Sequence, residues 1–310
     1  WTDVQPGFRK QPQDGGGHDV GGGMAKLLEG GHFFHKALVW AGWFENNPLR
    51  ALGLKESRVG TGPPGRGGAG EFRLCPGIGE FSVTRVAGGR KAGTVLLVME
   101  VEIRSFELPP IGTQCHVVLN PATQVLAVFD APLNAHATVE RLAVQTGYRI
   151  EGLYLTHGHW DHTLDGRRFN EQSIPTWGHE GDRHLFETPE VMAGFAIPGM
   201  EMPPLHIGTW LEHGRELQIA GRPVRIRHVP GHSEGSILYW FFDDGFVISG
   251  DALFNGSIGR TDFPGCSFEQ LASSIREQIY TLPDETVVYP GHGPTTTVGD
   301  EAGRNPFVSR

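Results

Sequence analysis

The stretch Thr156-His157-Gly158-His159-Trp160-Asp161-His162 places three histidines and one aspartate within six residues. It directly follows the largely apolar run Ile150–Leu155, which predicts a buried strand. Imidazole and carboxylate groups are ligands that a borderline divalent metal such as zinc prefers. The first two histidines are two residues apart and can point the same way, whereas the aspartate and third histidine are consecutive and can serve a second ion. The stretch predicts a metal-binding loop, and a histidine-rich loop without metal is the alternative.

Three more potential ligands follow predicted strands, each beside a glycine: His232 after Val224–Val229, Asp251 after Phe246–Ser249, and His292 after Val287–Tyr289. A glycine lets the backbone turn sharply where several loops converge. Five histidines and two aspartates exceed the needs of one tetrahedral zinc site. They suit two divalent ions that share a carboxylate and a water, and Asp251 is the natural bridge because both of its oxygens can bind.

The pattern from residue 99 onward predicts a layered α/β architecture with sheets inside. The runs Cys115–Leu119 and Gln124–Phe129 flank a turn and predict a β-hairpin. Apolar spacing predicts amphipathic helices over Ala135–Thr146 and Phe268–Tyr280. Residues 187–214 are rich in proline, glycine and methionine and predict a long loop, which in a compact domain often has a function.

Residues 1–98 differ in composition from residues 99–310. They hold 22 of the 45 glycines and all five lysines, and they carry a net charge of +4, against −13 for 99–310. Such a shift marks a domain boundary, and the glycine content disfavours an ordered core. We expect 1–98 to be a low-complexity segment that is disordered or precedes the native start near Met99. A short helix over His35–Phe44 is its one predicted element.

The whole chain of 310 residues has a net charge of −9, which excludes a basic nucleic-acid footprint. No apolar stretch reaches transmembrane length, and no secretory pattern opens the sequence. The three cysteines, Cys75, Cys115 and Cys266, form no paired motif and indicate a reducing compartment. We therefore expect a cytoplasmic protein with a small-molecule substrate and no membrane or nucleic-acid partner. The oligomeric state is not predicted.

These motifs resemble the metallo-β-lactamase superfamily. The stretch 156–162, with His232, Asp251 and His292, resembles its metal-binding pattern. The segments Gly250-Asp251-Ala252-Leu253-Phe254, Gly256–Gly265 and Tyr289-Pro290-Gly291-His292-Gly293-Pro294 are similar to the glyoxalase II-like hydrolases within it. The resemblance covers about residues 101–310.

The resemblance implies an αββα sandwich with the metals at one edge between two sheets. It implies two divalent ions, zinc being expected and iron or manganese the alternatives. The resemblance implies that His157, His159 and His232 hold the first ion. It implies that Asp161, His162 and His292 hold the second ion and that Asp251 bridges the two. The implied reaction is thioester hydrolysis by a metal-bridging hydroxide, which Asp161 also orients. Asp130 resembles an acid that orients a ligand histidine or its loop, and a strand-terminating turn aspartate is its alternative.

Other readings stay open at this point. A mononuclear-iron persulfide dioxygenase would use His157, His232 and Asp251 as ligands, and a lactonase or another superfamily hydrolase would keep the same site. Glutathione thioesters are not expected, because 99–310 contains no lysine and Gly293-Pro294 stands where an aromatic residue is common. The loop 187–214 is expected to supply an apolar wall or simply to pack on the sheet.

Three minor expectations concern charged residues near these motifs. Arg260 and Asp262 are expected to fix their loop rather than bind substrate. Asp165 and His179 are each expected to be a helix-cap or surface residue rather than a ligand.

Overall fold

The computed structural model describes residues 25–27, 38–40, 70–72, 81–86 and 94–310. The chain divides into two units, Trp1–Val98 and Met99–Arg310. A five-stranded sheet lies at the beginning of the chain, in the order β1 (Ala25–Leu27), β2 (Leu38–Trp40), β5 (Thr94–Met99), β4 (Phe81–Val86) and β3 (Gly70–Phe72).

The helix predicted over His35–Phe44 is wrong where the structure describes it. Leu38–Trp40 is strand β2, which pairs with β1 and β5. Pairing with neighbouring strands overrides the local preference of so short a run. The rest of that predicted helix lies outside the described residues, and the expected disorder of 1–98 stays a prediction.

The second unit contains two six-stranded sheets. The first has the order β11 (Thr209–Leu211), β10 (Thr176–His179), β9 (Arg149–Tyr154), β8 (Val125–Phe129), β7 (Thr113–Asn120) and β6 (Glu102–Leu108). The second has the order β12 (Glu216–Ile219), β13 (Arg222–His228), β14 (Ile237–Phe241), β15 (Phe246–Gly250), β18 (Val287–Pro290) and β19 (Thr296–Thr297). Helices flank this pair of sheets: α2 (Ala135–Thr146), α4 (Gly166–Glu171), α6 (Phe268–Ser274) with the π-helical turn η3 (Ile275–Ile279), and α7 (Val298–Arg304).

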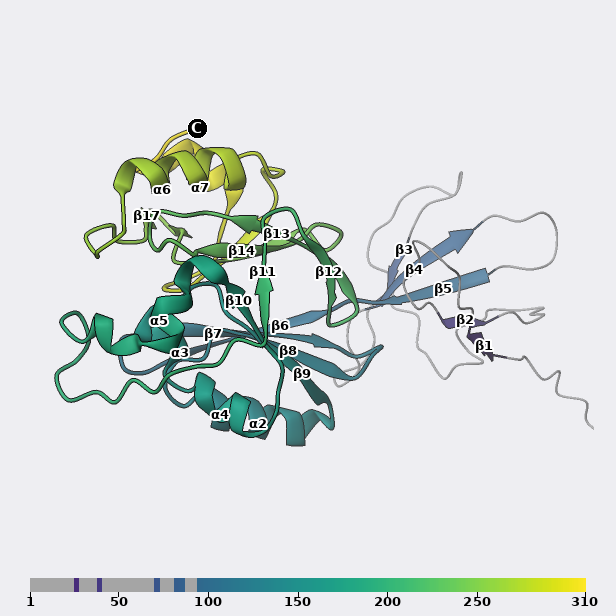
Figure 1. The fold of residues 1–310 in the computed structure, drawn as a ribbon. Helices are drawn as coiled ribbons and strands as arrows, with labels where there is room; N and C mark the ends of the chain where they lie inside the picture. The colour runs from purple at the N-terminus through teal and green to yellow at the C-terminus, as the bar shows by residue number, and fades with distance from the viewer. Residues whose placement is uncertain (1–24, 28–37, 41–69, 73–80, 87–93) are drawn as a thin grey trace, which may run out of the picture. The chain divides into compact units, whose positions relative to one another are not determined.

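Three buried clusters define four layers. Leu126 and Leu153 of the first sheet pack with Leu142 of α2. Between the sheets, side chains such as those of Phe129 and Tyr239 interlock. On the far side, the second sheet packs on α6, η3 and α7. Figure 1 shows α2 and α4 on one side of the paired sheets and α6 and α7 on the other. The predicted αββα sandwich is confirmed.

Burial on both faces explains why the central strands consist of nearly continuous apolar residues. All of β7 and β8 is buried, as expected for strands covered on both sides. The hairpin predicted from these runs is confirmed by their antiparallel pairing. The predicted helix at 268–280 is present as α6 followed by η3.

The segment predicted as a long loop, 187–214, contains only the 3₁₀ turn η2 (Pro189–Met192) and the short strand β11. It follows the turn η1 (Glu180–Asp182) and the helix α5 (Arg183–Glu187). Within the described residues, no helix is long and apolar enough to cross a membrane.

Strand directions bring the ligand-bearing loops to one edge. Strand β15 is parallel to β18. Strand β13 runs the same way as both, because it pairs antiparallel with β14 and β14 pairs antiparallel with β15. The loops that carry His232, Asp251 and His292 therefore leave the second sheet at the same edge.

Candidate metal centre

The seven predicted ligands meet at that edge. Donor atoms lie within 4.8 Å of one another in three overlapping groups: His157, His159 and His232; His157, His162 and Asp251; Asp161, His162 and His292. The loop after β9 and the short helix α3 (Trp160–Thr163) supply four of these residues from the first sheet. The structure thus places every candidate ligand in one cluster, although they come from four loops.

The first group presents three imidazole nitrogens to one point. His159 Nδ1 lies 2.8 Å from His232 Nε2, and His232 Nε2 lies 3.2 Å from His157 Nε2. Such close approach of ring nitrogens is favourable when their lone pairs bind a cation. The residues of this group are all buried.

The group of Asp161, His162 and His292, called the second group from here on, combines a carboxylate with two imidazoles. Asp161 Oδ2 lies 3.3 Å from both His162 Nε2 and His292 Nε2. His292 is the most exposed of the ligands, with a quarter of its side chain accessible. This position therefore opens toward solvent.

Asp251 lies between the two groups. Its Oδ1 is 3.3 Å from His162 Nε2, and its Oδ2 is 3.5 Å from both His232 Nε2 and His292 Nε2. Among the described residues, Asp251 Oδ1 and His162 Nε2 are buried with no hydrogen-bond partner. Buried polar atoms normally have partners, so these two fit the coordination of a divalent ion.

Two glycines allow close packing around the Asp251 loop. Gly250 has φ of +50°, and a Cβ at this position would collide with Thr156. A Cβ at Gly291 would collide with the Asp251 carboxylate. Glycine is the residue that tolerates both the positive φ and such close approach.

Asp130 holds the histidines of both groups. Its Oδ2 accepts a 2.8 Å hydrogen bond from His162 Nδ1 and another from Thr156 Oγ1, and its Oδ1 accepts one from the Thr156 backbone N–H. Thr156 Oγ1 in turn lies 3.0 Å from His157 Nδ1. Fixing Nδ1–H in this way leaves each Nε2 facing the metal position. Asp130 itself has φ of +60°, uncommon for a residue other than glycine.

Sequence reasoning missed three groups that orient the ligands. Thr113 Oγ1 donates a 2.8 Å hydrogen bond to Asp161 Oδ2. His232 Nδ1 donates a 2.7 Å bond to the Arg260 carbonyl. Asp182, on the turn η1, is the third. Thr113 and Asp182 lie outside the ligand motifs, so no local pattern points to them.

The fully buried carboxylate of Asp182 links two ligand loops. Its Oδ2 accepts hydrogen bonds from Gly158 N–H at 2.8 Å and from Ser233 Oγ at 2.7 Å. Its Oδ1 accepts a 2.6 Å bond from Gly235 N–H. Gly158 lies between two histidines of the first group, and Ser233 follows the third. Asp182 therefore sets the spacing of the first group without contacting the metal position.

Electrostatics differ between the two groups in the metal-free protein. Burial and neighbouring histidines hold the pKa of His157 and of His159 well below the usual value. Burial also acts on His162, but the three surrounding aspartates outweigh it and raise its pKa well above the usual value. Burial also lowers the pKa of His292, but Asp161 and Asp251 outweigh it and raise this pKa to about 9. The first group is therefore neutral and ready to bind, whereas the second group holds protons where a cation would lie.

The charged and polar residues near the motifs have their own partners in the structure. Asp165 is buried and accepts a 2.9 Å hydrogen bond from the His136 N–H at the start of α2. His179 is half-buried and stacks on His228 at 4.2 Å. Arg260 makes two 2.7 Å bonds to Asp262. None of these residues belongs to the described groups of candidate ligands.

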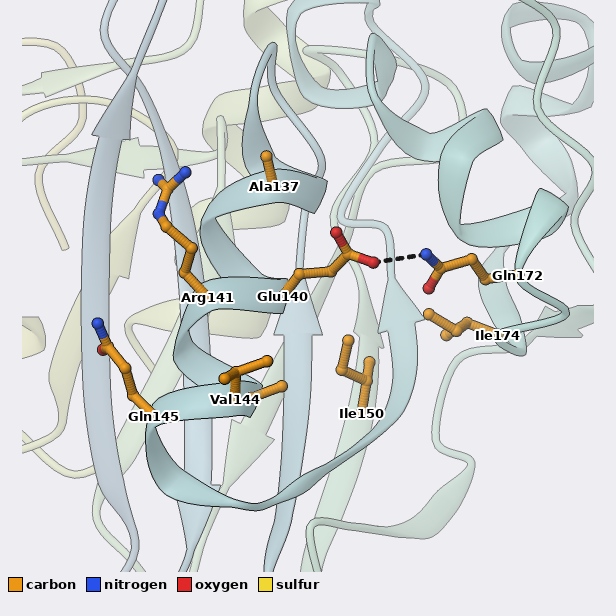
Figure 2. A pocket seen from close by; sticks show the side chains of 9 residues that line it. Ala137, Glu140, Arg141, Val144, Gln145, Ile150, Gln172 and Ile174 are labelled. Atoms are coloured by element: carbon orange, nitrogen blue, oxygen red, sulfur yellow. Dashed lines mark hydrogen bonds between the residues drawn. The ribbon is translucent and has the colours of Figure 1, made fainter.

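A surface groove beside α2 is separate from this cluster. Figure 2 shows its lining residues, with Glu140 of α2 accepting a 2.6 Å hydrogen bond from Gln172 and with Val144 nearby. Val144 is 84% exposed. None of the seven candidate ligands lines this groove.

Comparison with known proteins identifies the family. The pattern of the Metallo-beta-lactamase superfamily matches residues 112–292, a range that contains all seven candidate ligands and Asp130. The chain belongs to the metallo-β-lactamase superfamily. The family inferred from the sequence motifs is therefore confirmed.

Two curated relatives are named as hydrolases. The chain is 34% identical over 189 residues to hydroxyacylglutathione hydrolase GloC of Haemophilus influenzae, covering 59% of this chain and 87% of the relative. It is 35% identical over 184 residues to a probable metallo-hydrolase, YqgX of Bacillus subtilis, covering 59% and 86%. These similarities support an enzyme of the hydrolase type, and a glyoxalase II-like relationship is consistent with them.

Two solved structures share the fold. The B3 metallo-β-lactamase BLEG-1 aligns with a TM-score of 0.62 and 32% identity over 67% of this chain and all of its own. TTHA1623 in a di-iron-bound form aligns with a TM-score of 0.57 and 33% identity over 66% of this chain and all of its own. Together with the cluster of donors, these matches support binding of divalent metal.

Proposed function

We propose that residues 99–310 form a binuclear metal-dependent hydrolase that acts on a thioester or a related acyl substrate. The observation that carries the proposal is the position of Asp251, whose two oxygens lie within 3.5 Å of nitrogens from both histidine groups. A carboxylate so placed suits a bridge between two ions. We expect zinc in both positions, with iron or manganese as alternatives.

The ligands in this proposal are those predicted from the sequence. His157, His159 and His232 would hold the first ion, and Asp161, His162 and His292 would hold the second. Asp251 would be shared. Two bound divalent ions would polarise the scissile carbonyl and lower the pKa of a water held between them. Asp161, whose Oδ2 is oriented by Thr113, would accept a hydrogen bond from that water.

The surrounding residues keep this arrangement rigid. Asp130 and Thr156 fix the ring orientation of His162 and His157, and the Arg260 carbonyl fixes that of His232. A ligand whose second nitrogen is bonded loses less rotational freedom when it binds, and it is more basic. The proposed catalytic groups of the chain itself are Asp161 and Asp251.

The substrate class rests on similarity rather than on the site alone. The name of GloC, a hydroxyacylglutathione hydrolase, supports a thioester. Composition supports two further parts of the proposal. The substrate is a small molecule rather than a nucleic acid, and the protein is cytoplasmic. Among the described residues, Cys115 and Cys266 are free.

The test is a substrate panel combined with metal analysis. Thioesters, lactones, β-lactams and glutathione persulfide are each assayed with zinc, iron and manganese, and bound metal is counted in parallel. We expect two ions per chain and the highest kcat/KM with thioesters. One bound iron with sulfite produced from the persulfide would instead identify the mononuclear-iron dioxygenase, and preference for a lactone or a β-lactam would reject the thioester.

A further inference from the structure

Two aromatic side chains, the exposed Phe195 and the partly buried Phe263, lie beside the first metal position. The Phe263 ring lies 4.7 Å from the His159 ring and 6.1 Å from the His232 ring, measured between centroids. The Phe195 ring lies 5.0 Å from that of Phe263 and nearly perpendicular to it. Phe195 is 41% exposed. We refer to Phe195 and Phe263 as the aromatic wall.

Buried contacts hold the aromatic wall in place. Met192, in the same segment as Phe195, is buried against Trp160 and Leu164, which belong to or follow the metal-binding stretch. Phe263 packs against this same cluster. The Phe195 N–H donates a 2.9 Å hydrogen bond to the Met192 carbonyl. The distance between the wall and the ligand histidines is therefore set by packing rather than by a free loop.

The charge around the wall favours an uncharged occupant. The Arg260 guanidinium lies 4.2 Å from the centre of the Phe263 ring, but both of its bonds to Asp262 are 2.7 Å long. This cation is thus already paired, and residues 99–310 contain no lysine. Val191 and Ile197, on the same segment as Phe195, add exposed apolar surface.

We propose that the aromatic wall binds an uncharged aliphatic or aromatic group of the substrate, next to the bond that is cleaved. This inference rests on the proposed function and narrows its substrates to thioesters that carry a hydrocarbon arm. Covering exposed aromatic rings removes apolar surface from water, which stabilises the complex in proportion to the area covered. The wall is proposed to contact the substrate because Phe263 packs directly against the candidate ligand His159. The arm can belong to the acyl group or to the thiol, and the experiment separates the two.

Two series of thioesters test the wall. One series lengthens the acyl group from acetyl to octanoyl on a fixed thiol, and the other lengthens the thiol on a fixed acetyl group. Unreactive thioethers with the same arms are titrated calorimetrically into the metal-loaded protein. We expect kcat/KM and thioether affinity to rise about threefold per methylene in one series. Phe195→Ala should abolish this rise, and Phe263→Leu should reduce it.

Phe307→Ala is the matched control, because Phe307 is 52% exposed but lies after α7. It should leave the dependence on chain length unchanged. A flat response in both series, or a rise that survives in Phe195→Ala, overturns the wall. Thioethers that bind with the expected dependence while no thioester is hydrolysed would support the wall and reject the proposed function. Thioester hydrolysis that does not depend on chain length would support the proposed function and reject the aromatic wall.

Discussion

Replacing Asp182 with asparagine tests how the first metal position is built. The Asp182 carboxylate is completely buried and accepts three hydrogen bonds, from Gly158, Ser233 and Gly235. An amide keeps one acceptor oxygen and places an NH₂ group opposite at least one of these donors. The substitution therefore removes one or more bonds to a charged acceptor and leaves a buried donor unpaired.

The expected loss can be worked from those contacts. A hydrogen bond to a charged group contributes about 1.5–3 kcal/mol. Because the lost bonds join the loops that carry His157, His159 and His232, part of this cost should appear as weaker binding of the first ion. We expect an affinity about 10- to 100-fold lower, the range typical when a group that supports metal ligands is removed. The second ion should be affected much less.

The assay is competition for zinc with chelators of graded affinity, resolved into two binding steps. Glu301→Gln is the matched control, since Glu301 is also buried and accepts three hydrogen bonds, from Gly256, Thr296 and Asn305. Both variants should lose comparable stability toward denaturant, but only Asp182→Asn should weaken the first step. Unchanged first-step affinity in Asp182→Asn, or an equal drop in Glu301→Gln, would refute this reasoning.

Changing the residues that orient and bridge the ligands should have measurable effects, whereas removing the N-terminal unit should not. Asp130→Asn should weaken the second ion about 10- to 100-fold, because the ring of His162 loses its carboxylate partner; chelator competition measures this, and a selective loss at the first position would contradict it. Asp251→Ala should release at least one ion and lower kcat by several orders of magnitude, and full activity with two ions bound would reject the bridge. Burial lowers the pKa of His292, but the neighbouring aspartates outweigh it and raise this pKa to about 9. Protonated His292 should therefore stabilise the metal-free domain fully below pH ~6.5, and this stability should be lost as the pH rises through about 9. Affinity for the second ion should increase over the same range; urea unfolding and zinc titration at a series of pH values measure the two effects. Deleting residues 1–98 should leave metal content and activity unchanged, and an insoluble or metal-free truncated protein would contradict this.

The candidate ligands could be singled out from the sequence because they lie in loops that follow apolar strands. Strand ends at one edge of a sheet lie close together in space. Local motifs such as 156–162 were therefore sufficient to predict that residues distant in sequence form one site. The layered α/β architecture with sheets inside was predicted from the order of strands and helices along the chain, and the αββα sandwich came from the family resemblance. The buried runs of β7 and β8 fit strands that are covered on both faces.

The groups that orient the ligands could not be predicted in this way. Asp182 and Thr113 act across the fold, and their partners lie 24 to 53 residues away in sequence. Their role depends on loop paths that no local periodicity encodes. The short strand β2 was likewise missed, because its pairing with β1 and β5 is a property of the sheet rather than of Leu38–Trp40.

Anomalous diffraction from crystals of the metal-loaded protein tests the binuclear centre most directly. Data collected on both sides of the absorption edge of the bound metal locate each ion without reference to the protein chain. We predict two peaks about 3.5–4 Å apart, the first among His157, His159 and His232, the second beside His292, and Asp251 in contact with both. A single peak in fully loaded crystals, or an Asp251 carboxylate that contacts neither ion, would contradict the account.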